Sequence, residues 1–340
     1  MHVVILGAGS WGTALAIEFS RLKHYTYLWA RDSMQVNSMN QNRENIRYLP
    51  NISLPSNLKI TNDLNLALST ITFNKKNSLI ILGVPTSGLS NIFHEITSHI
   101  SIQRLSNANI IWTCKGFEKE SSLLPFEISR KFFSKIDINT GVLSGPSFAK
   151  EVAKGLPVAL TVASDNIELC SVVAHAIRGK CIRPYITQDM IGVEIGGALK
   201  NIIAIACGIS DGLNLGSNAR AAIITRGLAE MRRFGIALGA KSETFSGLTG
   251  LGDLTLTATG DLSRNRKIGI EIGNGKKLSE ILSSGITVEG VYSIRSALKR
   301  SKELGIELPI IEVVYSILFE NLDPISAVSV LLSRSGPLYE

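Results

Sequence analysis

Gly7-Ala8-Gly9-Ser10-Trp11-Gly12 follows the apolar run Val3-Val4-Ile5-Leu6 and leads into the helical pattern Thr13-Ala14-Leu15-Ala16-Ile17. A strand, a glycine turn and a helix start in this order are typical of a dinucleotide-binding βα turn. The first glycine allows the tight turn, the second lets a pyrophosphate approach, and the third lets the helix pack on the strand. Free N–H groups and the positive end of the helix dipole then face the phosphates. The stretch therefore predicts a dinucleotide site, with a purely structural glycine turn as the alternative.

The length of the chain, 340 residues, predicts two domains, which we place at residues 1–185 and 186–340. The most apolar window, residues 191–212, carries Glu194, Lys200 and Asn201 near its middle. Ionisable groups at the centre of a bilayer are costly, so we expect a buried helix and no membrane insertion. The first apolar run lacks a preceding basic region, so no signal peptide is expected.

The protein has a net charge of +7, which suits anionic ligands. The basic residues are scattered along the chain, which favours a small phosphorylated partner over nucleic acid. No C-x-x-C pair is present, and no histidine lies at ligand spacing from a cysteine, so we expect no metal site. We expect reduced thiols in a cytoplasmic protein at Cys114, Cys170, Cys181 and Cys207.

Short apolar runs alternate with helical segments up to about residue 185, which predicts a parallel sheet covered by helices. Strands are expected near residues 3–7, 25–30, 78–84, 109–114, 140–144 and 157–163. The proline- and asparagine-rich residues 33–69 are expected to form loops and short helices beside the sheet. Long periodic apolar stretches after Pro184 predict an all-helical second domain. Its helices are expected at 189–210, 217–238, 264–272, 278–283, 288–304, 310–319 and 323–333.

The end of the second predicted strand bears on the choice of cofactor. Sites specific for NAD usually carry an acid about 20 residues beyond the glycines, where it binds the ribose. This chain has Ala30 at that position, followed by Arg31 and Asp32. The guanidinium of Arg31 suits a 2′-phosphate, so NADPH is favoured over NADH, and both remain candidates. The alternative for Arg31 is an exposed ion pair with Asp32.

Lys200 lies in the apolar stretch Ile195–Ala204, on a helix that should be buried. Burying a lysine is costly unless the amine is paired or used. Burial also disfavours the charged amine, which suits a proton donor that works near neutral pH. Gly196 and Gly197, one turn earlier, leave space for a flat ligand. The alternative is a lysine at the helix edge whose amine reaches solvent.

Four further segments place polar groups where ligands bind. Lys115 closes one predicted strand and Ser144-Gly145-Pro146-Ser147-Phe148-Ala149 closes another, and open α/β sheets bind ligands at that edge. Asp253 lies in the glycine-marked turn of residues 250–257. Ser263-Arg264-Asn265-Arg266 joins a capping serine to guanidinium groups at a helix start, which suits a phosphate monoester. Residues 144–149 could equally be a structural loop, and the segments at 250–257 and 263–266 are each, taken alone, more often surface structure.

Together these segments closely resemble bacterial NAD(P)-dependent glycerol-3-phosphate dehydrogenases. The resemblance runs in order through G-A-G-S-W-G-T-A-L-A, C-K-G-F-E, S-G-P-S-F-A-K-E, I-G-G-A-L-K-N, N-A-R-A-A-I-I-T-R-G-L-A-E-M, G-L-G-D-L, S-R-N-R and V-E-G. It implies an α/β fold, a Rossmann-type doubly wound parallel sheet followed by an all-helical domain like that of 6-phosphogluconate dehydrogenase. The active site would lie between the two domains. The implied reaction is reversible hydride transfer from NAD(P)H to dihydroxyacetone phosphate, which gives sn-glycerol 3-phosphate for phospholipid synthesis.

The resemblance also assigns roles to residues. Lys200 would donate and accept the proton, with Lys115 and Asp253 as further catalytic groups. The residues around the substrate would be Lys115, Gly145, Ser147, Lys200, Asn201, Asp253, Thr257, Ser263, Arg264 and Asn265. Around the cofactor, beside the three glycines of the opening turn, would be Ser10, Trp11, Arg31, Lys115, Ala149, Arg264, Asn265, Thr287 and Glu289. Cys114 and Thr287 differ from the residues most common in the family.

A homodimer is expected from the apolar helices of the second domain. Two other functions fit parts of the sequence. A 3-hydroxyacid or ketopantoate-type reductase of the same superfamily would share the fold, but it would need a carboxylate grip in place of the phosphate cluster. A non-enzymatic dinucleotide sensor would bind the cofactor without turnover.

Overall fold

The computed structural model describes residues 1–71, 77–101, 105, 108–136, 138–283 and 288–332. Contacts between Cα atoms divide the chain into two units. The first comprises Met1–Lys115 and Leu124–Glu194, and the second comprises Gly116–Leu123 and Ile195–Glu340. The boundary predicted between residues 185 and 186 falls inside strand β10 (Ile182–Thr187), which belongs to the first unit.

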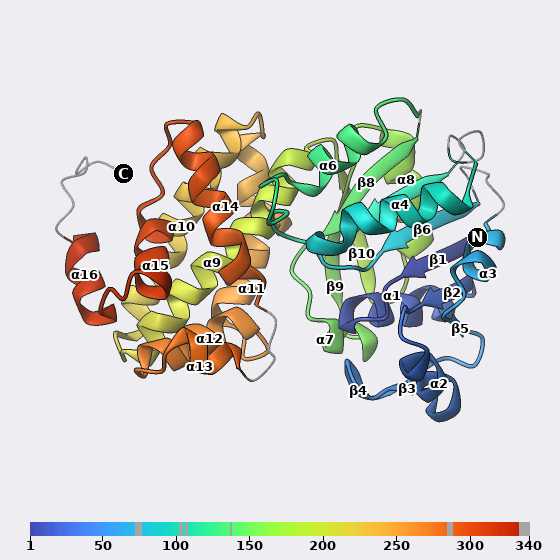
Figure 1. Ribbon diagram of the computed structural model, residues 1–340, viewed down its shortest axis with the longest axis horizontal. Helices are drawn as coiled ribbons and strands as arrows, with labels where there is room; N and C mark the ends of the chain where they lie inside the picture. Colours follow the sequence, from blue (N-terminus) through green and yellow to red (C-terminus); the bar gives the residue numbers. More distant parts are fainter. Residues whose placement is uncertain (72–76, 102–104, 106–107, 137, 284–287, 333–340) are drawn as a thin grey trace. The chain divides into compact units, whose positions relative to one another are not determined.

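The first unit is built on an eight-stranded sheet with the strand order β10-β9-β8-β7-β6-β1-β2-β5 (Figure 1). Its other strands are β1 (His2–Leu6), β2 (Tyr25–Trp29), β5 (Lys59–Thr61), β6 (Ser78–Leu82), β7 (Asn109–Trp112), β8 (Asn139–Ser144) and β9 (Val158–Ala163). Its helices are α1 (Ser10–Arg21), α2 (Ser33–Asn42), α3 (Leu64–Ser69), α4 (Leu89–His99), α6 (Pro125–Phe132), α7 (Ala149–Ala153) and α8 (Ile167–Ile177).

The sheet is parallel at every pair of neighbouring strands except β8 and β9, which are antiparallel. The expectation of a wholly parallel sheet is therefore wrong at this point. The connection from β8 to β9 contains only the five-residue helix α7. A helix of that length spans about 7.5 Å. Parallel neighbours are usually joined by a crossover helix that runs the length of the strand, and α7 is too short for a six-residue strand of about 20 Å. The chain enters β9 in the opposite direction instead.

Sequence reasoning missed two strands of the sheet and a small hairpin. Strand β5 is only three residues long. Strand β10 contains Pro184 and lies at the edge of the sheet, where a strand tolerates proline. The hairpin of β3 (Glu44–Asn45) and β4 (Leu49–Ser53) lies within the segment expected to hold only loops and short helices.

Helices cover both faces of the sheet. Alternate residues of a strand point to opposite faces. Val3, Ile5 and Ile111 belong to one hydrophobic core, together with residues of α1 and α8. Trp112, the neighbour of Ile111, lies in an edge-to-face contact with Phe93 of α4, at 6.5 Å between ring centroids. Every residue of β6 and β7 is buried, as expected for strands covered on both sides.

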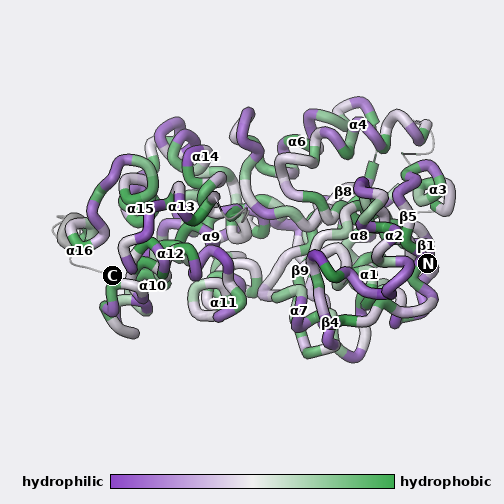
Figure 2. The backbone as a smooth tube through the Cα atoms, turned by 60° about the horizontal axis from the view of Figure 1, so that its bottom comes forward, coloured by the Kyte–Doolittle hydropathy of each residue, from purple (hydrophilic) through white to green (hydrophobic). Residues whose placement is uncertain are grey.

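The described residues of the second unit form helices and no strand, which confirms the expected helical character. The helices are α9 (Met190–Gly212), α10 (Gly216–Ala237), α11 (Asp253–Thr259), α12 (Arg264–Gly273), α13 (Leu278–Leu282), α14 (Glu289–Glu303), α15 (Pro309–Phe319) and α16 (Pro324–Leu332). Only α11 was not predicted, because its start was interpreted as a glycine turn. Hydrophobic and hydrophilic residues alternate along most helices, as in helices with one buried face (Figure 2).

Helix α9 is long and apolar enough to cross a membrane, but 89% of its apolar window is buried inside the protein. Two of its glycines, Gly208 and Gly212, face Gly269 and Gly273 of α12. A Cβ atom on Gly269 would lie 2.2 Å from the carbonyl oxygen of Ile205. The two helices therefore meet backbone to backbone, and α12 has a fixed position on α9.

A buried carboxylate joins α10 to α15. Glu230 accepts hydrogen bonds from the N–H groups of Ile310, at 2.7 Å, and Ile311, at 3.4 Å. Glu230 thereby caps the first turn of α15, where N–H groups lack partners within the helix. Burial raises the pKa of the Glu230 carboxyl to about 7, although the two N–H groups act in the opposite direction.

This shift predicts how stability depends on pH. The folded protein binds the Glu230 proton more tightly than the unfolded chain, whose pKa is near 4.5. The stabilising contribution is complete below about pH 4.5 and is lost as the pH rises through about 7. Since one pKa unit corresponds to about 1.4 kcal/mol, Glu230→Gln should remove up to a few kcal/mol of this pH dependence. Denaturant unfolding between pH 5 and 8 measures the change, and an unaltered slope in the variant would contradict the prediction.

Candidate active site

The three glycines of the turn have different roles: Gly7 and Gly12 allow close packing, and Gly9 leaves space for a ligand. Gly7 has a φ of +118°, and a Cβ atom there would lie 2.7 Å from the carbonyl oxygen of Gly83. A Cβ on Gly12 would lie 2.0 Å from the carbonyl oxygen of Gly7. A Cβ on Gly9 would meet no described protein atom within 4 Å. The space in front of Gly9 is therefore open, and it suits the close approach of a pyrophosphate.

The first turn of α1 fits an anion. Gly9 is its N-cap residue, and among the described residues no side chain caps this helix. By contrast, side chains of Asp32, Asn166 and Ser263 cap α2, α8 and α12. The N–H groups of an uncapped first turn are free to bind phosphate. Ser10 donates a hydrogen bond from Oγ to the carbonyl oxygen of Tyr48, at 2.6 Å.

At the end of β2, Ala30 is buried and Arg31 is exposed. Asp32 caps α2, accepting from the N–H of Met34 at 2.9 Å. Its other carboxylate oxygen pairs with Arg47, at 3.3 Å. The Asp32 carboxylate is thus engaged with α2 and Arg47, and the exposed Arg31 side chain lies at the position where the ribose of a dinucleotide is expected.

Three predicted substrate residues meet at the carboxyl ends of β7 and β8. Lys115 Nζ donates to the carbonyl oxygen of Gly145 at 3.4 Å, and Ser147 Oγ donates to the same oxygen at 3.2 Å. Gly145 adopts a φ of +134°, which an L side chain rarely permits. Ala149, the last residue expected here, begins α7. An ammonium group and a hydroxyl therefore converge at this edge of the sheet.

Lys200 is buried and paired. The alternative, in which its amine reaches solvent from the helix edge, does not hold. Its side chain is 9% exposed, and Nζ donates to Asp253 Oδ1 at 2.5 Å and to Thr257 Oγ1 at 3.0 Å. Thr257 Oγ1 donates in turn to the Asp253 carbonyl oxygen, at 2.6 Å. Gly196 makes room for these partners, because a Cβ there would lie 2.2 Å from the Thr249 carbonyl oxygen. A held ammonium group of this kind can stabilise a developing alkoxide and supply its proton.

A chain of amides joins three helix segments of the second unit. Asn201 donates from Nδ2 to Glu289 Oε2 at 3.1 Å, and accepts on Oδ1 from Asn265 Nδ2 at 2.9 Å. Asn265 Oδ1 accepts from the N–H of Gly290, at 3.1 Å. The structure thus brings three predicted site residues together from α9, α12 and α14. Thr287 lies outside the described residues.

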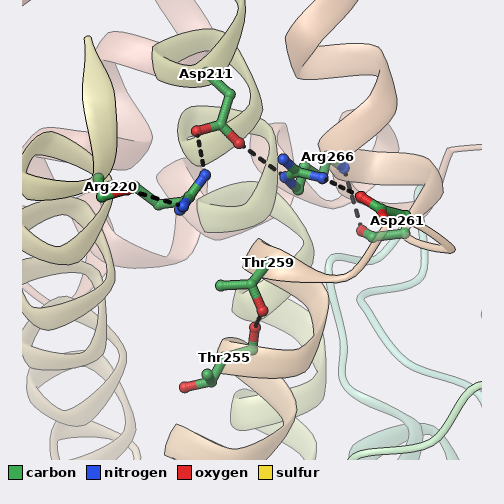
Figure 3. Close-up of polar contacts among 8 residues, drawn as sticks. Asp211, Arg220, Thr255, Thr259, Asp261 and Arg266 are labelled. Carbon is green, nitrogen blue, oxygen red and sulfur yellow. Dashed lines mark hydrogen bonds and ion pairs between the residues drawn. The ribbon is translucent and has the colours of Figure 1, made fainter. Parts of the chain in front are cut away.

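The two arginines at the start of α12 have different surroundings. Arg266 donates from Nε to Asp211 at 2.8 Å and from Nη1 to Asp261 at 3.0 Å (Figure 3). Asp211 also accepts from Arg220, at 2.8 Å. Arg264 is exposed, beside the N-cap Ser263, and forms no ion pair with a described residue. Arg266 therefore anchors the helix, while Arg264 is placed to bind an anion.

Sequence reasoning missed the partly buried Asp211 and the role of the buried Glu194, two acids that position these segments. Asp211 lies in the last turn of α9 and fixes Arg266; the signal was an acid where the helix dipole favours a cation. Glu194 accepts from Trp112 Nε1 at 2.6 Å and from the N–H of Phe126 at 3.1 Å. Burial raises the pKa of the Glu194 carboxyl to about 8. Its place in an apolar window was noticed, but its donors lie far away in the sequence.

A Rossmann-type sheet with an open glycine turn, together with a helical unit that holds a paired, buried lysine, defines a dinucleotide-dependent oxidoreductase. Models of the N- and C-terminal parts of NAD-dependent glycerol-3-phosphate dehydrogenase match residues 2–170 and 189–329. The chain belongs to this family.

Similar proteins cover the chain almost completely. A relative from Herminiimonas arsenicoxydans, named glycerol-3-phosphate dehydrogenase [NAD(P)+], is 47% identical and covers 99% of this chain and 98% of its own length. The glycerol-3-phosphate dehydrogenase of Coxiella burnetii is 41% identical in sequence. Its crystal structure matches with a TM-score of 0.90, with 98% of each chain covered. The enzyme of that name from Saccharomyces cerevisiae is 26% identical, with a TM-score of 0.81 over 97% of this chain and 99% of its own.

Because Gly9 faces the ligand and Gly12 packs against backbone, replacing each by alanine should affect a different property. Gly9→Ala should leave the free energy of unfolding within about 0.5 kcal/mol of the parent and weaken NADPH binding at least tenfold. Gly12→Ala should destabilise the fold by about 1–3 kcal/mol, as overpacking does. Denaturant unfolding and fluorescence titration with NADPH measure both quantities. Unchanged NADPH binding by Gly9→Ala would contradict the close approach of a pyrophosphate.

Proposed function

We propose that this protein is an enzyme that reversibly reduces dihydroxyacetone phosphate to sn-glycerol 3-phosphate with NAD(P)H, and so supplies the glycerol backbone of phospholipids. The observation that carries the proposal is the buried Lys200, held by Asp253 and Thr257. Relatives matched over nearly their whole length bear the name of this dehydrogenase. The fold and the open glycine turn suit the nicotinamide cofactor that such a reaction needs.

When bound, the nicotinamide supplies the hydride to the ketone carbon and accepts it in the reverse direction. Lys200 Nζ hydrogen-bonds the ketone oxygen, stabilises the negative charge that develops there, and delivers the proton. Asp253, at 2.5 Å, pairs with the ammonium group and orients it. Lys115 adds positive potential for the anionic substrate, and Ser147 offers it a hydroxyl.

The phosphate group of the substrate is held by Arg264 and the first turn of α12. Ser263 caps one N–H group of this turn, and the other N–H groups of a first turn lack partners within the helix. Together with the exposed Arg264 guanidinium they suit a phosphate monoester. Arg266 keeps the helix start in place through Asp211 and Asp261. Binding energy from the phosphate then aligns the reacting carbon, as remote contacts commonly do in catalysis.

Three finer properties also belong to the proposal. NADPH is preferred over NADH, because Ala30 takes the place of the acid that usually binds an unmodified ribose and the exposed Arg31 follows it. The enzyme works in the cytoplasm, which accords with four free cysteines. It forms a homodimer, for which exposed apolar side chains of the second unit, such as Ile236 and Leu251, offer contact area.

Lys200→Met should lower kcat about 100-fold or more with dihydroxyacetone phosphate and NADPH, because the proton donor is lost. Since the change leaves the Asp253 carboxylate buried without its ammonium partner, Lys200→Met/Asp253→Asn keeps the test valid if the single variant unfolds. NADPH binding, measured by fluorescence titration, should stay near the parent value in both. Turnover within about tenfold of the parent would place the proton donor elsewhere.

Arg264→Ala should raise KM for dihydroxyacetone phosphate about 10- to 100-fold, the worth of a charge-assisted hydrogen bond. KM for unphosphorylated dihydroxyacetone should change little. Lys267→Ala, which removes one exposed positive charge from the same helix, is the matched control and should affect neither KM strongly. Equal losses on both substrates would contradict the phosphate role and favour a reductase that grips a carboxylate.

A further inference from the structure

The loop of the β3–β4 hairpin is anchored to the glycine turn. Asn45 is buried, and its Nδ2 donates to the Ala8 carbonyl oxygen at 3.0 Å and to Thr13 Oγ1 at 2.8 Å. Tyr48, three residues later, accepts the Ser10 hydroxyl at 2.6 Å on its carbonyl oxygen. Both ends of the short turn between these residues are therefore tied to the start of α1.

Arg47 lies between those two anchors and is tied to a second element. Its Nη1 lies 3.3 Å from Asp32 Oδ2, just beyond the end of β2. Its guanidinium carbon lies 5.1 Å from the centroid of the Tyr48 ring. In dinucleotide-binding folds, the adenosine ribose lies between the start of the first helix and the end of the second strand, here α1 and β2. Arg47 is thus held against Asp32, the residue that follows the exposed Arg31, at the ribose end of the predicted cofactor site.

The ion pair with Asp32 orients Arg47 and leaves most of its N–H donors available for a ligand. A guanidinium carries five N–H donors, and the contact with Asp32 uses one of them. The Arg47 side chain is 62% exposed, and exposed ion pairs contribute at most about 1 kcal/mol. The Asp32 carboxylate, which also accepts two N–H groups of α2, offsets only one of the two guanidinium charges. The local charge around Arg31 and Arg47 is therefore positive.

We propose that Arg47 is a second guanidinium, with Arg31, for the 2′-phosphate of NADPH, and that Asp32 positions it. A phosphate dianion accepts bidentate hydrogen bonds from two guanidinium groups, whereas the ribose hydroxyl of NADH leaves both without an anion. Arg47 thereby contributes to cofactor choice. The proposal deepens the NADPH preference given above and rests on it.

The test is equilibrium binding to the full chain of two nucleotides that differ in the 2′-phosphate, 2′,5′-ADP and 5′-AMP. Calorimetry should show that Arg47→Ala weakens 2′,5′-ADP binding about tenfold or more, the worth of a charge-assisted contact. Binding of 5′-AMP should change less than twofold. Arg47→Lys should recover part of the loss, because it keeps the charge without the planar fork. KM for NADPH should rise in parallel, while KM for NADH stays constant.

Lys59→Ala is the matched control, since Lys59 is an exposed cation on the neighbouring strand β5 and should affect neither nucleotide. Equal weakening of both nucleotides by Arg47→Ala would overturn the proposal, because Arg47 would then act on the adenine or on the fold. Unchanged binding of both would overturn it as well. These measurements need no turnover, so a chain that binds 2′,5′-ADP through Arg47 but does not reduce dihydroxyacetone phosphate would contradict the proposed function alone.

Discussion

Helix α9 meets its neighbours backbone to backbone, and the arrangement of the second unit depends on that contact. A Cβ atom on Gly196 would stand 2.2 Å from the Thr249 carbonyl oxygen, and one on Gly208 would stand 2.1 Å from that of Arg266. The first contact fixes the segment that gives Lys200 its carboxylate partner. The second fixes the start of α12, where the proposed phosphate site lies. The glycines of this one helix thereby position both the segment that pairs with Lys200 and the proposed phosphate site.

Close packing of this kind buries polar groups, and each of the buried acids described above has donors from another segment. Asp253 pairs with Lys200, Glu194 accepts from Trp112, and Glu230 caps α15. An unpaired buried charge would cost several kcal/mol, so these contacts restrict which helix can pack where. Apolar contact alone tolerates many arrangements, so these polar pairs add specificity to the packing.

Much of the architecture could be predicted from local sequence. The glycine turn, the apolar strands and the periodic helices follow from short-range rules of backbone geometry and amphipathicity. The antiparallel entry of β9, the hairpin at Glu44–Ser53 and the helix that begins at Asp253 could not be predicted in this way. Each depends on connection length or on distant packing. The resemblance to a known family supplied the site residues where spacing alone left alternatives.

The sequence by itself determined the fold class, the dinucleotide turn and the presence of a lysine in an apolar helix, because these are properties of neighbouring residues. Only the tertiary structure decided which partners that lysine has, since Asp253 and Thr257 are 53 and 57 residues away along the chain. It also decided that Arg266 is paired while Arg264 is exposed, and that Arg47 pairs with Asp32. Hydrogen bonds and ion pairs act over a few ångströms in space, so sequence distance does not reveal them.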